Sequence, residues 1–113
     1  NIFEGSQGNW KLLRSNIVAT GRKGDDTPVG VYTVTIRHKY GWTTSDYHVS
    51  PVVRFKEGSG LAFHSRKYDP KNQTKLIDPS IGYPVSLGCI RMYDADIDWI
   101  YDTIPQHTTV VVY

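Results

Sequence analysis

Short β-rich runs fill most of this chain of 113 residues, and only one stretch has the period of a helix. The runs end at clusters of Gly, Pro, Asn and Asp, which is typical of strands joined by turns. We expect two strands within residues 2–13 and further strands at residues 17–20, 31–36, 47–49, 52–55, 61–65 and 108–113. Many short strands with one helix predict a mostly β domain, arranged like a sandwich or a barrel.

The helical stretch lies near the C-terminus. Its apolar residues recur at positions i, i+3, i+4 and i+7, on one face of a helix: Ile97, Ile100, Tyr101 and Ile104. Asp94 is the expected N-cap, and Pro105 ends the pattern. We therefore expect one short helix that packs this face against the sheet, followed by a central or closing strand at residues 108–113.

A long polar segment, residues 66–85, connects the strand at 61–65 to Cys89, the only cysteine. It is rich in Pro, Gly, Asn and Lys and has little periodicity. A segment of this length without regular structure is usually either functional or disordered. Because it joins the two residues with the most reactive chemistry, His64 and Cys89, we favour a functional lid or pocket wall.

Cys89 is the candidate nucleophile. It follows Gly88, so a substrate carbonyl can approach the thiol closely and backbone N–H groups can face a developing oxyanion. A free cysteine is more commonly a small buried hydrophobe. His64 changes this balance, because an imidazole within hydrogen-bond reach would take the thiol proton and favour the thiolate. One cysteine with a distant histidine is a recognised catalytic pattern.

Three segments resemble the catalytic domain of bacterial L,D-transpeptidases: residues 27–32, residues 63–65 and residues 86–92 with the sequence Ser-Leu-Gly-Cys-Ile-Arg-Met. The likeness runs from about residue 8 to residue 113. It implies a β-sandwich of mixed sheets, with the active cysteine in a cleft under a lid. Similar domains start one or two strands earlier, so we expect residues 1–113 to be one catalytic domain of a longer protein, truncated at its N-terminus.

The resemblance also implies roles for individual residues. Cys89 would be the nucleophile, His64 the base, and the backbone N–H groups of Gly88 and Cys89 the oxyanion donors. One position departs from the family, because Leu87 stands where its members usually have a second histidine. Cys89 and His64 are also 25 positions apart (89 − 64), which implies a longer loop than compact members have.

Three further residues flank the expected site. Ser86 has a hydroxyl close to the thiol, which orders the site or makes an ordinary turn hydrogen bond. Ser65 is expected to fix the tautomer of the neighbouring imidazole through its backbone carbonyl. Arg91 either organises the pocket or binds a substrate carboxylate as a bidentate donor, or else it pairs at the surface with Asp94 or Asp96.

Other classes of site and partner are not favoured. The four histidines have scattered spacings and there is no second cysteine, so we expect no metal and no cofactor. A net charge of +2, from 13 basic and 11 acidic residues, is too balanced for nucleic-acid binding. The apolar stretches are too short to enter a membrane, so we expect no membrane contact within this segment. The sequence leaves the oligomeric state open.

The resemblance implies an extracytoplasmic enzyme of the bacterial cell envelope whose signal or anchor lies outside this segment. Its substrates would be peptidoglycan stem peptides, cross-linked through a cysteine acyl-enzyme with release of D-Ala, and a carbapenem would acylate Cys89. A rival interpretation is a catalytically silent peptidoglycan-binding module, for which Leu87 would be a sign of decay. An L,D-carboxypeptidase, with water as acceptor, and a cysteine acyltransferase for other peptides also remain open.

Overall fold

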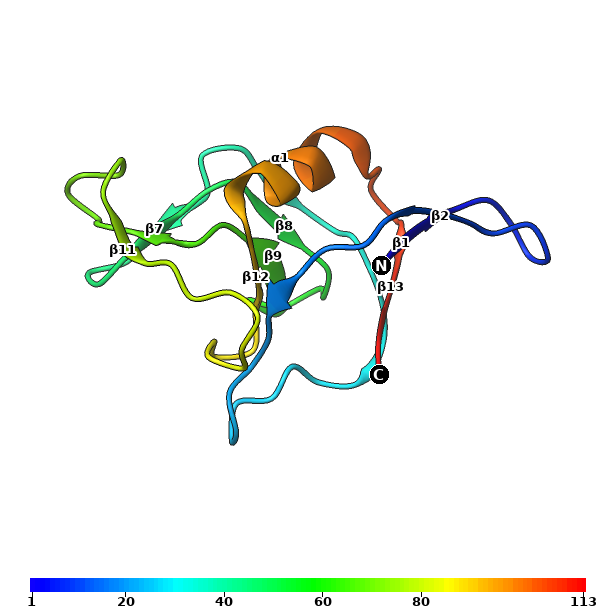
Figure 1. Cartoon of the computed structure of the whole chain (residues 1–113), viewed down its shortest axis with the longest axis horizontal. Helices are drawn as coiled ribbons and strands as arrows, with labels where there is room; N and C mark the ends of the chain where they lie inside the picture. Colours follow the sequence, from blue (N-terminus) through cyan, green and yellow to red (C-terminus); the bar gives the residue numbers. More distant parts are fainter.

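The computed structural model of the protein describes residues 1–113, which form thirteen strands and one helix (Figure 1). In chain order these are β1 (Ile2–Glu4), β2 (Lys11–Arg14), β3 (Val18–Ala19), β4 (Gly30–Thr33), β5 (Arg37–His38), β6 (Trp42–Thr43), β7 (His48–Val49), β8 (Val52–Arg54), β9 (Ala62–His64), β10 (Lys67–Tyr68), β11 (Leu76–Asp78), β12 (Ile90–Met92), α1 (Asp94–Thr103) and β13 (Thr109–Val112). The predicted mostly β fold, with several sheets and one short helix after Cys89, is confirmed.

The central sheet has five strands in the order β3-β12-β9-β8-β5. It is mixed, because β12 runs parallel to β9 while the other neighbours are antiparallel. Arg91 of β12 pairs with His64 of β9, and Ala62 of β9 pairs with Arg54 of β8. This register determines which side chains share a face of the sheet.

The two faces of the central sheet carry different clusters. Val53 and Met92 belong to the core beneath α1, whose Ile97 and Ile100 are buried against them (Figure 1). Adjacent residues on a strand point to opposite faces of the sheet. Val52 and Ala62 therefore join a second cluster, together with Val49 of β7 and the partly buried Cys89.

Helix α1 packs as its apolar spacing predicted, but its start differs. Asp94 is the first helical residue rather than the N-cap, and the N-cap position is held by Tyr93 without a side-chain hydrogen bond. The Asp94 carboxylate is instead engaged with β10 and the residue before it: Arg66 Nε lies 3.3 Å from Oδ1, and the Tyr68 hydroxyl donates to Oδ2. These contacts join the polar segment to the helix.

The polar segment 66–85 contains regular structure, so the expectation of a loop without any is wrong. Strands β10 and β11 pair as an antiparallel hairpin at one edge of a four-stranded sheet, β11-β10-β7-β6. Asp69 stabilises the hairpin loop, since its Oδ1 accepts the N–H groups of Lys71 and Asn72 at 2.8 and 2.9 Å. Strands of two and three residues are too short to show a period in the sequence.

Other differences concern strand boundaries. Strands β5, β6 and β12 were not among the expected strands, and the strand expected at residues 31–36 ends early, because β4 stops at Thr33. Pro51 separates β7 from β8, which lie in different sheets. Strand β13 pairs only with β4, so it is a closing strand and not a central one.

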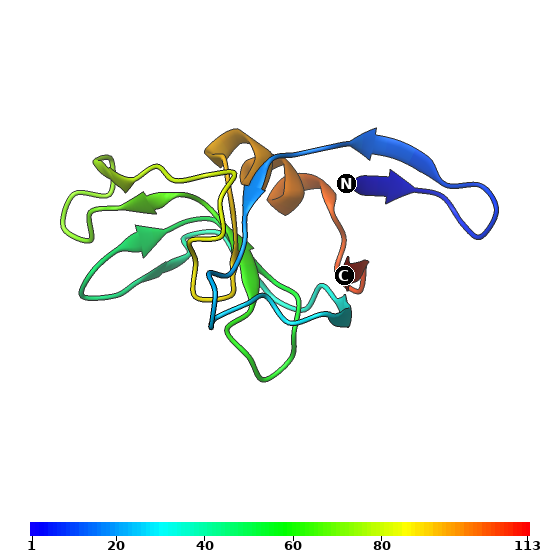
Figure 2. The same ribbon diagram turned by 60° about the horizontal axis from the view of Figure 1, so that its bottom comes forward.

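The molecule is elongated, with extents of 47 × 30 × 27 Å. The two hairpins of the four-stranded sheet lie at one end and the hairpin β1–β2 projects at the other (Figure 2). No helix is both long and apolar enough to cross a membrane.

Candidate active site

Cys89 lies at the end of a tight turn that leads into β12. Ser86, which is buried, closes this turn: its Oγ donates to the Cys89 carbonyl at 2.6 Å and accepts the Gly88 N–H at 3.1 Å. Gly88 has φ +123°, where a side chain is strained, and a Cβ there would meet Leu61 Cδ2 at 3.4 Å. The chain therefore needs a glycine to turn the thiol onto the sheet.

Thr27 holds the same turn from outside. Its Oγ1 donates to the Gly88 carbonyl at 2.8 Å and accepts the Gly21 N–H at 3.0 Å. The backbone of Ser86 also bonds to this region, through Arg22 and Thr20. The sequence assigned no role to Thr27, and its only signal was its place in a segment that resembles the family.

His64, at the end of β9, is buried and has a defined orientation. Its Nδ1 donates to the Ser65 carbonyl at 2.6 Å, which leaves Nε2 as the acceptor of a neutral imidazole. Burial lowers the pKa of His64 to about 4, with the charges of Arg91 and Lys67 adding to this and the Ser65 hydrogen bond opposing it. The imidazole is therefore neutral at pH 7.

Cys89 shares a sheet face with His64. Ile90 pairs with Phe63 across the parallel strands, so the preceding residue, Cys89, lies beside Ala62. Side chains two positions apart on a strand point to the same face. Ala62, His64 and Cys89 therefore all lie on the face of the central sheet that is turned away from α1.

The thiol does not bond to the imidazole in this conformation. Cys89 Sγ donates to the Gly60 carbonyl at 3.2 Å, and no hydrogen bond joins it to His64. Burial raises the pKa of the Cys89 thiol, although a hydrogen bond from Ala62 and the charges of Arg54 and Lys67 oppose this. The expected thiolate–imidazolium pair is therefore not the resting state, which is a neutral thiol beside a neutral imidazole.

The backbone donors around the thiol are not equivalent. The Gly88 N–H is engaged with Ser86 Oγ, whereas the Cys89 N–H donates to no acceptor within the chain. Of the two oxyanion donors that the resemblance implies, only the Cys89 N–H is unoccupied in this conformation. Leu87 between them is 66% exposed.

Arg91, on β12, lies beside His64 of β9 and is 1% exposed. Its Nη1 lies 3.0 Å from Asp78 Oδ2 and donates to the Ser80 carbonyl at 3.4 Å, while its Nε has no hydrogen-bond partner. Burial alone would raise the pKa of Asp78, but hydrogen bonds from Ser80 and the charge of Arg91 lower it. Arg91 thus ties the end of β11 to the central sheet.

The expected alternative for Arg91, a surface pair with Asp94 or Asp96, is wrong. Asp94 pairs with Arg66, and Asp96 pairs with Arg14 at 3.0 Å. Local sequence favoured these aspartates because they are only three and five positions away. The tertiary fold instead brings Asp78 from the hairpin to Arg91.

Two aromatic side chains complete this face, and the sequence did not single out either. Trp42 and Tyr47 pack against the cluster that contains Ala62 and contacts Cys89. The centroids of the Trp42 and His64 rings are 6.3 Å apart, and Cζ of the Arg54 guanidinium lies 5.2 Å from the centroid of the same indole. Only the pairing of strands distant in sequence reveals these neighbours.

The other histidines do not join the site. His48 is 6% exposed on β7, which lies between β10 and β6. Its two ring nitrogens lie 2.8 Å from Thr43 Oγ1 and 3.2 Å from Ser50 Oγ. No three His, Cys, Asp or Glu side chains gather where they could hold a metal ion.

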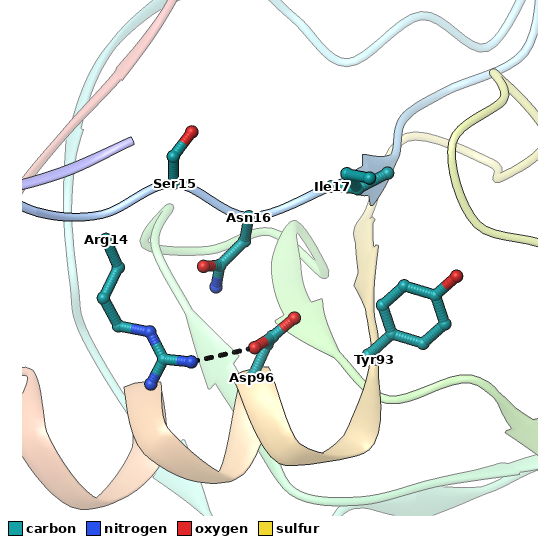
Figure 3. A pocket seen from close by; sticks show the side chains of 6 residues that line it. All are labelled: Arg14, Ser15, Asn16, Ile17, Tyr93 and Asp96. Carbon is teal, nitrogen blue, oxygen red and sulfur yellow. Dashed lines mark hydrogen bonds and ion pairs between the residues drawn. The ribbon is translucent and has the colours of Figure 1, made fainter.

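A cavity of about 400 Å³ lies on another part of the molecule, between residues 14–17 and the start of α1. Figure 3 shows the Arg14–Asp96 ion pair on its wall, with Tyr93 at one side. None of the expected catalytic residues lines it. The candidate active site is therefore the exposed side of the Cys89 turn and not this cavity.

A family model of the L,D-transpeptidase catalytic domain, YkuD, matches residues 4–112. The chain belongs to the L,D-transpeptidase family. The resemblance seen in the sequence is thereby confirmed.

Two Bacillus subtilis proteins named as candidate L,D-transpeptidases are similar to this domain. YciB is 30% identical over 114 residues, which cover 98% of this chain and 58% of YciB. YqjB is 28% identical over 103 residues, which cover 84% of this chain and 56% of YqjB. This L,D-transpeptidase domain spans a little over half the length of these curated relatives.

Solved structures share the fold. An L,D-transpeptidase from Mycobacterium tuberculosis H37Rv matches with a TM-score of 0.66 at 30% identity, over 87% of this chain and 42% of that chain. A fused Zn-dependent amidase, peptidase and peptidoglycan-binding protein from Clostridium acetobutylicum matches with a TM-score of 0.78 at 25% identity, over 98% of this chain and 45% of that chain. L,D-transpeptidase 3 from Mycobacterium tuberculosis, solved with a faropenem-derived adduct, has a TM-score of 0.66 at 27% identity, over 86% of this chain and 43% of that chain.

Proposed function

We propose that this domain is an extracytoplasmic L,D-transpeptidase that cross-links peptidoglycan stem peptides through an acyl-enzyme on Cys89. The observation that carries the proposal is the shared sheet face of Cys89 and His64 in a chain of the L,D-transpeptidase family. The acyl donor is a stem tetrapeptide that ends in D-Ala. The acceptor is an amine on the third residue of a second stem.

The first half-reaction forms the thioester. The Cys89 side chain turns from the Gly60 carbonyl toward His64 and gives its proton to Nε2. The sulfur attacks the carbonyl of the third stem residue, and the amide bond to D-Ala breaks. His64 then returns the proton to the nitrogen of the leaving D-Ala.

The second half-reaction uses the same base. The amine of the second stem attacks the thioester carbonyl and loses a proton to His64. The carbon–sulfur bond breaks as the new amide forms, and the Cys89 thiolate takes the proton back. Water in place of the amine would give the carboxypeptidase outcome.

Backbone and side-chain contacts support these roles. The free Cys89 N–H is suited to donate to the oxyanion of each tetrahedral intermediate. Gly88 and Ser86 keep the turn in the shape that presents this N–H, and the Ser65 carbonyl keeps the proton on Nδ1. Their role is therefore to order the site.

The test is incubation with purified stem tetrapeptide, followed by mass spectrometry for free D-Ala and a cross-linked dimer. We expect both products from the wild type and neither from folded Cys89→Ala. His64→Ala should lose more than about a hundredfold in rate. His107→Asn is the matched control, because His107 is exposed with φ 71°, a conformation that Asn tolerates. Product formation by Cys89→Ala would remove Cys89 as the nucleophile.

A silent peptidoglycan-binding module is the second candidate. Two observations favour it: Leu87 in place of the second histidine, and the missing hydrogen bond between Cys89 and His64. An active enzyme should change by no more than about tenfold on Leu87→His, about 1.4 kcal/mol of barrier. A gain of several hundredfold would favour the decayed enzyme.

A β-lactam provides a test that needs no stem peptide. The faropenem-derived adduct belongs to Mycobacterium tuberculosis L,D-transpeptidase 3, a relative of this domain. We expect a carbapenem to acylate Cys89, because a strained lactam carbonyl is an acyl donor that a thiolate opens. Intact mass and peptide mapping would locate the adduct, and its absence would favour the silent module.

A further inference from the structure

Arg54 lies in the same cross-strand row as Cys89. It is the last residue of β8 and pairs with Ala62 of β9, and the neighbour of Ala62 on the far side is Cys89. Paired residues point to the same face, and adjacent strands are about 4.8 Å apart. Arg54 and Cys89 are therefore about 10 Å apart at the backbone. Ala62, which lies between them in the row, is fully buried, whereas Arg54 and Cys89 are partly exposed.

The guanidinium of Arg54 has no carboxylate partner. The four ion pairs of the protein use other arginines: Arg14, Arg22, Arg66 and Arg91. Arg54 lies over the Trp42 indole, and its Nη1 donates to the Ser59 carbonyl at a long 3.4 Å. Its Nε is buried without any acceptor. A buried donor on a cation without a partner is costly, and a bound anion would relieve this cost.

The indole connects this cation to the base. The centroid of the Trp42 ring lies 5.2 Å from Cζ of Arg54 and 6.3 Å from the centroid of the His64 ring. The guanidinium, the imidazole and the thiol are thus arranged around Trp42 and Ala62 on one face of the sheet. Ala62 itself is fully buried, whereas Cys89, Trp42 and Arg54 are partly exposed. A ligand whose carbonyl contacts Cys89 can therefore extend along the exposed side of Trp42 toward Arg54.

We infer that Arg54 is a specificity-determining residue that binds the free carboxylate of the residue on the leaving side of the cut bond. This inference rests on the proposed function and specifies its substrates as peptides with a free C-terminal carboxylate. In such a peptide only three bonds separate the carboxylate carbon from the attacked carbonyl carbon. Successive Cα atoms are about 3.8 Å apart, so the carboxylate lies within reach of an arginine in this row. A guanidinium binds a carboxylate through two parallel hydrogen bonds.

Lys67 provides a charge-matched comparison. Its positive charge also opposes the rise in the Cys89 pKa. Its ammonium group, however, lies 4.2 Å from the Tyr47 ring and faces the charges of Asp46 and Asp78. It therefore lacks the orphaned donor of Arg54, and its removal tests the effect of charge alone.

The decisive experiment is a binding measurement in the Cys89→Ala background, which excludes turnover. Stem tetrapeptide with a free C-terminal carboxylate and the same peptide as its C-terminal carboxamide are titrated by calorimetry. We expect the acid to bind about 10- to 100-fold more tightly than the amide. Arg54→Gln should bring the ratio close to one, Arg54→Lys should retain part of it, and Lys67→Gln should leave it unchanged.

Each outcome has a distinct meaning. Equal affinity for acid and amide with Arg54 present overturns the inference, and so does a ratio that falls as far in Lys67→Gln as in Arg54→Gln. If Arg54→Gln does not fold, a ratio in Arg54→Lys equal to that of the parent overturns it. An Arg54-dependent preference together with no turnover by the protein that retains Cys89 upholds the carboxylate site and rejects the proposed transpeptidase.

Discussion

Cys89 and His64 are both in their neutral forms, which burial favours. Burial raises the pKa of the thiol and lowers the pKa of the imidazole, so both are neutral at pH 7. A charged pair on this face would lose hydration without forming a hydrogen bond to each other. The thiolate is therefore expected to form during attack and not before it.

Alkylation of Cys89 reports this state directly. Because only the thiolate reacts, the rate with iodoacetamide should rise steeply above about pH 8, with no plateau near neutral pH. The profile of His64→Gln should be almost the same, since the imidazole does not bond to the resting thiol. A neutral-pH plateau that disappears in His64→Gln would contradict the neutral pair.

The lowered pKa of His64 also affects stability. The unfolded chain binds a proton near pH 6.5, whereas the folded protein binds it only near pH 4, so unfolding is favoured as the pH falls through this window. The titration of His64 should therefore lower the free energy of unfolding by as much as about 3 kcal/mol between neutral pH and pH 4. Urea denaturation at several pH values should show a shallower loss in His64→Gln. Equal slopes would show that His64 titrates normally.

At the scale of elements, the hairpin β10–β11 is held to the central sheet by charged side chains. Asp78 at the end of β11 binds Arg91, and Asp94 at the start of α1 binds Arg66 and the Tyr68 hydroxyl. Arg91 is also the strand neighbour of His64. The position of the hairpin is thus coupled to the site through an ion pair whose guanidinium is buried and whose carboxylate is partly exposed.

Breaking that pair should loosen the hairpin. Asp78→Asn leaves the Arg91 charge buried without its counterion, which should cost about 1–3 kcal/mol of stability. Hydrogen exchange should increase for the amides of β10 and β11 more than for those of β8. Lys75→Gln is the control, because Lys75 is an exposed residue of the same hairpin loop. Uniform exchange in Asp78→Asn would show that the pair does not hold this element.

At the scale of the whole molecule, the central sheet separates two layers. One face forms the core with α1, and the other carries the cluster on which Cys89 and Trp42 pack. Val52 and Val53 are adjacent on β8, fully buried, and belong to opposite layers. They allow the two layers to be compared within one strand.

Val52→Ala and Val53→Ala should each destabilise the protein by about 1–3 kcal/mol, because both remove fully buried methyl groups. Only Val52→Ala should slow acylation of Cys89 by a carbapenem, since Val52 pairs with His64 in the site layer. Chemical denaturation and adduct formation, measured well below the melting temperature, separate the two effects. Equal slowing in both variants would show that the layers are not independent.

Features that depend on local chemistry could be predicted from the amino-acid sequence. Its turn residues and short apolar runs indicated a mostly β fold, and the i, i+3, i+4 spacing identified the face of α1. The family segment at residues 86–92 identified the family, with Cys89 as the expected nucleophile. These features could be predicted because each lies within a few consecutive residues.

Contacts between residues distant in the sequence depend on the folded arrangement of the strands. Strands β10 and β11 gain their order from pairing, and a run of two or three residues has no period to reveal it. The partner of Arg91 is Asp78 and not its near neighbours, because burial of the guanidinium selects the carboxylate that the fold brings to it. The direction of the Cys89 thiol and the row that contains Arg54 likewise follow from strand register, which long-range packing sets.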